Sequence, residues 1–230
     1  MTSGSETLGG TAITPPPHEG PAIPYEEQVE RARAALPATL PEDPRKMLVA
    51  LDIDGTLITA DGASRRVKRT IAELVESGVN VVIATGRGLP GTRPILRELE
   101  LPTGHTVSSN GAQTVWWERQ SDGGHSYEVV KKEFLDPRPA MDQILRVIPD
   151  VIFATDDGEK MRVNRHFPLG DLTAAQVLYS LEELKDLPTI RMVTRAPWLE
   201  RHDFVAALEA ADLSDYELSV GWTSWADITA

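Results

Sequence analysis

The chain has 230 residues, a formal net charge of -12 and no cysteine. Its length is sufficient for one domain and a smaller second unit. Its acidity argues against nucleic acid or an anionic membrane as a partner, because phosphate groups repel a negative protein, and the lack of cysteine excludes disulfides, thiolate catalysis and sulfur-ligated zinc.

Membrane insertion and secretion are not predicted. No apolar run approaches the roughly 18 residues that a membrane span needs. Residues 1–20 have neither the basic start nor the apolar stretch of a secretory signal. We therefore expect a cytoplasmic protein that binds neither nucleic acid nor membrane. The five histidines do not have the spacing of metal ligands, so no role is predicted for them.

The N-terminal residues 1–45 differ in composition from the rest of the chain. Residues 1–46 hold 8 of the 17 prolines and a single aromatic residue, Tyr25. Such a segment buries too little apolar surface to offset the chain entropy lost on ordering. We predict a mostly disordered, proline-rich tail, with room for a short helix over 25–36.

From Lys46 onward the pattern is that of a parallel α/β sheet. The predicted elements are a strand at 47–51, a helix at 65–77, a strand at 79–84, a helix near 93–99 and a strand at 105–108. The first strand is a continuous apolar run, typical of burial on both faces. Ser64 can cap the start of the first helix and Gly78 its end. The alternation predicts right-handed crossovers and a Rossmann-like sheet.

After Gly111 the pattern predicts a separate α+β unit. Its predicted strands are 113–117, 126–131, 151–155, 161–164, 189–194, 216–220 and 222–228, and its predicted helices are 140–147, 174–185 and 199–211. The first two strands flank Asp122-Gly123-Gly124, a typical hairpin turn. The tryptophans of this region are interpreted as core or hairpin packing rather than as a stacking platform; they are Trp116, Trp117, Trp222 and Trp225.

Two carboxylates directly follow the first predicted strand, in the segment Asp52-Ile53-Asp54-Gly55-Thr56-Leu57. In open α/β sheets, ligands bind beyond the carboxyl ends of the strands. One carboxylate there can attack while the other moves protons. A surface turn also accepts Asp and Gly, but the buried strand before this segment favours a catalytic role.

Polar segments also follow the next two strands. Ile83-Ala84-Thr85-Gly86-Arg87 ends the second strand, and a hydroxyl beside free backbone N–H groups can hold a phosphate. Arg87 could orient a substrate or pair with a carboxylate. Ser108-Ser109-Asn110-Gly111-Ala112 follows the third strand. Each segment alone is common, since Asn-Gly is an everyday turn, but three in order at successive strand ends predict one site.

Together these segments resemble the haloacid dehalogenase (HAD) superfamily, in particular its Cof-like phosphatases. The first segment resembles the DxDGT motif, the second the following motif, and the third the SNGA segment. The resemblance implies that Asp52 is a nucleophile that forms an aspartyl-phosphate and that Asp54 is the general acid/base. It also implies Mg²⁺ held by Asp52 and by the backbone carbonyl of Asp54. The implied phosphate or substrate contacts are Thr85, Gly86, Arg87, Asn110 and Gly111.

The same resemblance implies a domain organisation. After the tail of residues 1–45, the N-terminal part of a HAD core would occupy 46–112, an inserted α+β cap 113–220, and a strand returning toward the core 221–230. In this subgroup the cap covers the site and selects the substrate. Its candidate contacts are Arg162, Asn164 and Arg191, although a solvated surface or an ion pair is the commoner role for such residues.

Two further HAD motifs, a lysine and an acidic GDxxND segment, are not found in the sequence. No lysine follows Lys185, and Gly170-Asp171 lacks a second acidic residue at the required distance. We therefore expect a chain that stops before these motifs and has little turnover alone. We also expect the strand at 47–51 to be an exposed apolar edge.

Three functions are consistent with this pattern. The first is a Mg²⁺-dependent phosphohydrolase of a small phosphorylated metabolite, of which this chain is either a fragment or one of two chains that complete each other. The second is a truncated, non-catalytic protein that binds a phosphorylated ligand or a partner. The third is a phosphomannomutase-like phosphotransferase. The sequence favours the first and does not identify the substrate.

Overall fold

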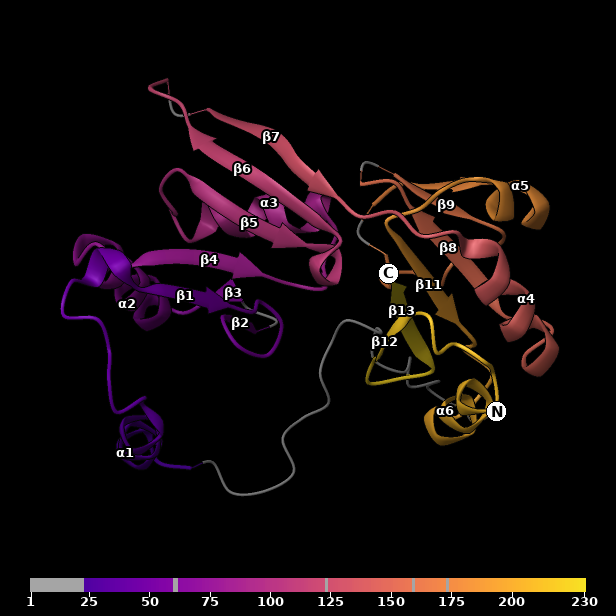
Figure 1. The fold of residues 1–230 in the computed structure, drawn as a ribbon, viewed down its shortest axis with the longest axis horizontal. Coiled ribbons are helices and arrows are strands. Elements are labelled where there is room, and N and C mark those ends of the chain that lie inside the picture. The colour runs from indigo at the N-terminus through magenta and orange to yellow at the C-terminus, as the bar shows by residue number, and fades with distance from the viewer. Residues whose placement is uncertain (1–22, 60–61, 123, 159, 173) are drawn as a thin grey trace, which may run out of the picture.

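The structure is a computed structural model that describes residues 23–59, 62–122, 124–158, 160–172 and 174–230. Two β-sheets form two units that lie beside each other (Figure 1). Most of the tail that we predicted to be disordered, residues 1–22, lies outside the described residues. The short helix expected over 25–36 is α1 (Tyr25–Ala35), and none of its residues is buried. None of the described helices combines the length and apolarity needed to cross a bilayer.

The first sheet carries the three polar segments, and its strand order is β1-β4-β5-β6-β7. The strands are β1 (Leu48–Leu51), β4 (Asn80–Ala84), β5 (Gly104–Ser108), β6 (Gln113–Arg119) and β7 (His125–Lys132). β4 runs parallel to both β1 and β5. The carboxyl ends of these three strands therefore meet at one edge, and the predicted Rossmann-like arrangement is confirmed.

Two helices connect the parallel strands. α2 (Arg65–Glu76) begins where the Ser64 side chain accepts the N–H of Val67, and Gly78, just past its end, has a φ of +93°. Both predicted caps are thus present. α3 (Leu89–Glu98) begins earlier than expected, because Pro90 in the first turn lacks only an N–H that would have no partner within the helix. The minor elements are η1 (Pro44–Lys46), β2 (Ile58–Thr59), β3 (Gly62–Ala63) and η2 (Ser109–Gly111).

Buried isoleucines tie the first polar segment to the sheet. Ile53 and Ile83 are fully buried, and both pack in one cluster with Ile71 of α2 and Trp117 of β6. Trp117 also stacks on His125, with ring centroids 4.3 Å apart. The packing role expected of Trp117 is confirmed, and the loop after β1 is anchored from below by the core.

The hairpin of β6 and β7 belongs to the first sheet, although we expected the second unit to begin at Gln113. η2 reverses the chain, so that β6 lies antiparallel to β5 from Gly104↔Trp117 to Ser108↔Gln113. The main-chain hydrogen bonds of β5 are satisfied in this way on the side away from β4. The second unit therefore begins only after Lys132.

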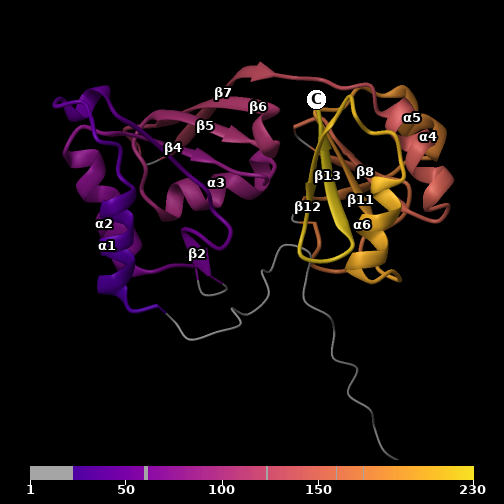
Figure 2. The same ribbon diagram turned by 60° about the horizontal axis from the view of Figure 1, so that its bottom comes forward.

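The second sheet is mostly antiparallel, in the order β10-β9-β8-β11-β13-β12. Its strands are β8 (Ile152–Asp156), β9 (Met161–Val163), β10 (Gln176–Leu178), β11 (Arg191–Arg195), β12 (Glu217–Val220) and β13 (Trp225–Thr229). Its helices are α4 (Pro137–Val147), α5 (Leu181–Asp186) and α6 (Arg201–Glu209). Figure 2 shows these helices on the side of the sheet that faces away from the first unit.

Alternation along the strands sorts the side chains of the second sheet onto two faces. Phe153, Met192 and Ile228 point to the helices and form the larger core cluster. Their neighbours point to the opposite face, which no helix of the described chain covers; it carries an apolar group around Val193 and Trp225. Because successive side chains alternate, the charged residues of these strands also lie on this uncovered face.

Two further expectations about the second unit are wrong. Residues 221–230 do not return to the first sheet. Instead, β13 pairs with β11, beginning at Met192↔Ile228, and with β12, beginning at Glu217↔Thr229. The helix expected over 174–185 begins only at Leu181, where Ser180 and Glu183 form a capping box. The preceding residues of β10 include β-branched Val177 and pair instead with β9.

β1 is an edge strand, as predicted. Among the described strands it pairs with β4 alone, and Leu48 is 64% exposed. By contrast, Ile83 on the neighbouring strand has no exposed surface. The two side chains therefore differ greatly in the apolar area that they remove from water.

We expect Ile83→Ala to lower the free energy of unfolding by about 2–5 kcal/mol, because it leaves a cavity in the core. Leu48→Ala, at the exposed edge, is the matched control and should change it by less than about 0.5 kcal/mol. Urea unfolding followed by circular dichroism measures both values. Equal losses in the two variants would contradict the described burial.

Candidate active site

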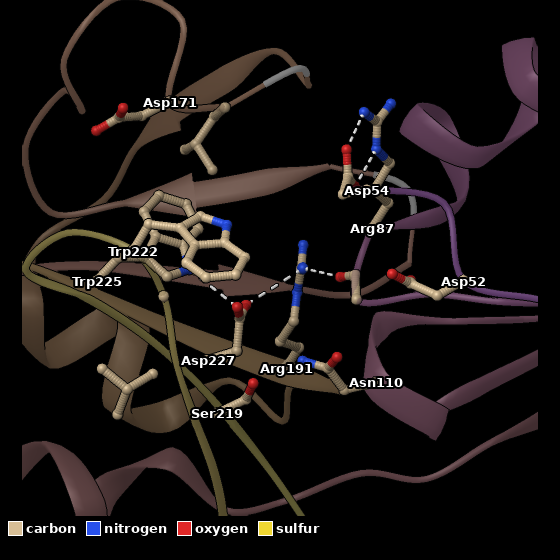
Figure 3. A pocket seen from close by; sticks show the side chains of 15 residues that line it. Asp52, Asp54, Arg87, Asn110, Asp171, Arg191, Ser219, Trp222, Trp225 and Asp227 are labelled. Atoms are coloured by element: carbon tan, nitrogen blue, oxygen red, sulfur yellow. Dashed lines mark hydrogen bonds and ion pairs between the residues drawn. The ribbon is translucent and has the colours of Figure 1, made fainter. Parts of the chain in front are cut away.

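A cleft of about 270 Å³ lies between the edge of the first sheet and the uncovered face of the second. The first unit contributes Asp52, Asp54, Gly86, Arg87 and Asn110 to its lining. The second unit contributes, among others, Ser219, Arg191, Asp227, Trp222 and Trp225 (Figure 3). The volume lies just below the range of roughly 300–1,000 Å³ typical of small-molecule sites.

The side chain of Asp52 is exposed, and the residue directly follows the carboxyl end of β1. The turn that follows it is held by Ile53, whose carbonyl accepts the backbone N–H groups of Thr56, Leu57 and Ile58 at 3.0–3.3 Å. Gly55 supplies the positive φ, +76°, that this turn requires. The carboxylate lies in the cleft beside the loops that carry Gly86 and Asn110 (Figure 3), which is the placement that the sequence predicted.

Asp54 and Arg87 form a bidentate ion pair. Arg87 donates from Nε to Oδ2 of Asp54 at 2.7 Å and from Nη2 to Oδ1 at 2.6 Å. The hydrogen bond to Asp54 raises the pKa of Arg87 above its ordinary value, and the charges of Asp54 and Asp52 add to this effect. Of the two roles considered for Arg87, the structure shows the pairing with a carboxylate.

The loops after β4 and β5 are bonded to each other. Thr85 accepts the N–H of Asn110 at its carbonyl, and the N–H of Ser109 donates to the carbonyl of Arg87 at 2.8 Å. A Cβ on Gly86 would lie 2.7 Å from Oδ1 of Asn110, so a larger residue at this position would require the Asn110 side chain to shift. Asn110 itself adopts the left-handed conformation, with φ of 53°.

Thr85 and Gly111, two of the predicted phosphate contacts, do not line the cleft. Thr85 is 5% exposed, and its hydroxyl accepts the N–H of Arg87 at 3.2 Å. The hydroxyl therefore shapes the loop in this conformation. Gly86, Arg87 and Asn110 do line the cleft, together with both aspartates.

Arg191 of β11 joins the two units. Its Nη1 donates to the carbonyl of Gly86 at 2.5 Å and to Asp227 at 3.3 Å. Its Nη2 donates to Asp156 at 3.1 Å, and the Arg191 side chain is 8% exposed. A second contact between the units is the ammonium of Lys132, which donates to the carbonyl of Asp157 at 2.7 Å.

Asp227 is a carboxyl of the cleft with a raised pKa. Burial raises its pKa above the ordinary value of 3.8, and Arg191 and the indole of Trp225 offset only part of this effect. The indole Nε1 of Trp225 donates to Oδ2 of Asp227 at 2.9 Å. The negative charge of Asp156 raises the pKa further.

Of the three contacts predicted from the second unit, only Arg191 lines the cleft. Arg162 forms an ion pair with Asp157, and Asn164 accepts the N–H of Phe153 at 2.7 Å. Both are structural contacts. Asp227 and Ser219 were not predicted as site residues, and Trp222 and Trp225 were interpreted as packing residues. Alternation over 225–229 could have placed Trp225 and Asp227 on one face.

The oxygen atoms of the cleft fit Mg²⁺ only if water and a substrate phosphate complete its coordination shell. Among the described residues there is no group of three or more His, Asp or Glu that could hold a metal ion. Asp52 and Asp54 nevertheless supply two carboxylates and a backbone carbonyl at the polar end of the cleft, the end that the first unit forms. Mg²⁺ is commonly bound through one or two carboxylates, with water and substrate phosphate completing its shell.

Comparisons with known proteins support the interpretation of the first unit. Residues 49–138 match the family of haloacid dehalogenase-like hydrolases. A Streptococcus pyogenes protein named "Putative phosphatase" is 44% identical over 70 residues, which are 28% of this chain and 25% of that protein. The "Putative phosphatase YkrA" of Bacillus subtilis is 32% identical over 124 residues, 52% of this chain and 44% of that protein. The chain thus spans less than half of each relative.

A solved structure extends the similarity to both units. A haloacid dehalogenase-like hydrolase from Bacteroides thetaiotaomicron superimposes with a TM-score of 0.59 at 18% identity. The superposition covers 80% of this chain and 70% of that one. At this level of identity the comparison establishes the fold.

Arg191→Ala should lower the free energy of unfolding by about 3–5 kcal/mol, because it leaves buried Asp156 and partly buried Asp227 without their cation. The matched control is Arg69→Ala, which removes an exposed pair with Glu73. That change should be within about 0.5 kcal/mol. A loss below about 1 kcal/mol for Arg191→Ala in urea unfolding would contradict the bridging role.

Asp227 should make stability depend on pH. A carboxyl with a raised pKa binds its proton more tightly in the folded chain, so its contribution is fully present below pH 3.8 and is lost as pH rises through the raised value. The stability of the wild type relative to Asp227→Asn should therefore fall as pH rises from about 3.5 to 7.

Urea unfolding across this range measures the difference, with Asp212→Asn as the same change at an exposed position. A difference that stays constant or grows with pH would show that Asp227 does not have the raised pKa described.

Proposed function

We propose that this chain, whose residues 49–138 match the family of haloacid dehalogenase-like hydrolases, is a phosphohydrolase of a small phosphate monoester that acts through an aspartyl-phosphate on Asp52. One observation carries this proposal. The Asp52 carboxylate is exposed in a cleft whose other lining groups include Arg87, Arg191 and Asn110. A nucleophilic carboxylate beside cations and an amide is suited to an anionic, transferable group.

The proposed reaction has two steps. An oxygen of Asp52 attacks phosphorus, the bond from phosphorus to the ester oxygen breaks, and Asp54 supplies the proton that the leaving alcohol requires. Water then attacks the phosphorus of the aspartyl-phosphate and loses its proton to Asp54. This step releases inorganic phosphate and restores the Asp52 carboxylate.

Asp54 has to change partner for this role. In the structure both of its oxygens accept hydrogen bonds from Arg87, so neither oxygen is available to a leaving group or a water molecule. When a phosphate enters, Arg87 can transfer its hydrogen bonds to the phosphoryl oxygens and leave Asp54 free to exchange protons. Arg87 would then both bind substrate and control when the acid/base is available.

Magnesium, held by Asp52 and the backbone carbonyl of Asp54, would screen the repulsion between the attacking carboxylate and the phosphate. That the substrate is a small phosphorylated metabolite and that the protein is cytoplasmic remain predictions. So does a complementing C-terminal fragment.

A second function is favoured by one feature of the described residues. Asp52 and Asp54 supply two carboxylates, whereas a metal site built by the protein alone would have more acidic ligands. Phosphate binding without turnover is therefore the alternative, and it differs from the first proposal in forming no covalent intermediate.

We expect acetyl phosphate, with Mg²⁺, to phosphorylate the intact chain on Asp52, because this small donor needs no contact beyond the polar end of the cleft. Mass spectrometry of the peptide that contains Asp52 detects the product. Asp52→Asn should abolish labelling, and Asp54→Asn should slow the loss of the label about 10²-fold or more, because it removes the base.

Asp212→Asn makes the same charge change at an exposed position outside the cleft and should label like the wild type. Labelling of Asp52→Asn, or none in the wild type while phosphate still binds, would reject the covalent mechanism. The latter result would favour the binding function.

A further inference from the structure

Trp222 is the most exposed tryptophan of the cleft. It lies in the connection between β12 and β13 and is 53% exposed, whereas Trp117 is 2% and Trp225 6% exposed. Figure 3 shows it on the wall opposite Asp52. A large indole face is therefore left in contact with water at the site where a ligand is expected.

The backbone on both sides of Trp222 is firmly held. The N–H of Gly221 donates to the carbonyl of Trp225 at 2.9 Å, and Arg201 donates from Nε to the carbonyl of Gly221 at 2.9 Å. Arg195 donates from Nη1 to the carbonyl and the hydroxyl of Ser224 at 3.1 and 2.6 Å. The exposed ring is thus carried on a connection that is fixed before any ligand binds, which lowers the entropy lost on binding.

The second unit also contributes apolar groups to the lining of the cleft. Leu172, Val220 and Trp225 also line it, and Trp225 packs edge-on against Phe167 with ring centroids 5.7 Å apart. The charges of the opposite end, Asp52 and Arg87, belong to the first unit. The cleft therefore has one end suited to phosphate and another suited to an apolar body.

The carboxylates near the apolar end are already engaged. Asp227 accepts from Arg191 and Trp225, and Asp171 accepts from Nε of Arg195 at 2.9 Å. Besides the hydroxyl of Ser219, the described side chains at this end offer mainly the flat apolar surface of Trp222 and of the apolar residues named above. A sugar ring with several hydroxyls would lose hydrogen bonds to water there, whereas an aromatic ring would not.

We propose that Trp222 is a specificity-determining residue that stacks on the leaving group, and that the substrates are phosphate monoesters of aromatic ring compounds. This inference rests on the proposed function of the same cleft. Offset stacking on the indole holds the ring while the phosphate lies beside Asp52 and Arg87. Trp222 acts on binding of the leaving group and takes no part in proton or phosphoryl transfer.

The test compares the affinities of 2-naphthyl phosphate and inorganic phosphate, measured by calorimetry on the intact chain without reliance on turnover. The wild type should bind 2-naphthyl phosphate more tightly than inorganic phosphate. Trp222→Ala should reduce this preference roughly tenfold, and Trp222→Phe should retain most of it, because phenylalanine preserves a ring face.

The matched control is Trp198→Ala, which removes a tryptophan of similar exposure, 49%, that does not line the cleft. Trp198 contacts Arg165, whose guanidinium lies 5.5 Å from the ring centroid, and its removal should leave the preference unchanged.

Two results would overturn the inference: no preference for the aryl ester in the wild type, or the same preference in Trp222→Ala as in the wild type. Failure of the proposed function appears separately, as an absence of acetyl phosphate labelling at Asp52. Acetyl phosphate has no ring, so that result does not depend on Trp222 as a stacking surface.

Discussion

The cleft depends on the bridge that Arg191 makes between the two sheets. A guanidinium on β11 reaches the carbonyl of Gly86, in the loop after β4, while its other hydrogen bonds go to Asp156 and Asp227 on neighbouring strands. The carboxylates of Asp156 and Asp227 stabilise the positive charge of the Arg191 guanidinium, which is largely removed from water. The hydrogen bond to the carbonyl of Gly86 orients the guanidinium toward the first unit. Together with the hydrogen bond from Lys132 to the carbonyl of Asp157, this contact holds the uncovered face of the second sheet against the strand ends that carry Asp52.

The same bridge divides the chemistry between the units. The first unit holds the groups that can act on a phosphate, Asp52, Asp54 and Arg87, because parallel strands bring their carboxyl ends to one edge. The second unit holds Trp222 and Trp225, because a connection and an alternating strand turn them toward that edge. In the proposed function, reactivity belongs to the first unit and selection of the leaving group to the second.

Much of the first unit could be predicted from the sequence, because its signals are local. A buried apolar run followed by Asp52 and Asp54, and two further polar strand ends, are sufficient to place a site at one edge. Pairing between distant segments is not a local property. The alternation of 113–119 fits either sheet, so the hairpin was assigned to the wrong unit, and β13 was expected in the first sheet although it pairs with β11 and β12. Nothing in the sequence separates Arg191 from Arg162, since their roles depend on which carboxylates lie nearby. Trp222 was interpreted as packing because burial cannot be read from a single aromatic residue.

The placement of the β6–β7 hairpin has a consequence for motion. With that hairpin in the first sheet, the described chain passes from one unit to the other once, through residues 133–136 between β7 and α4. A single covalent tether allows rotation of the units with few changes of backbone angle, but it also keeps Arg191 near Gly86 after the contact breaks. Reclosure is then an intramolecular event at a high effective concentration. A few hydrogen bonds can therefore close the cleft and still let a bound ligand leave.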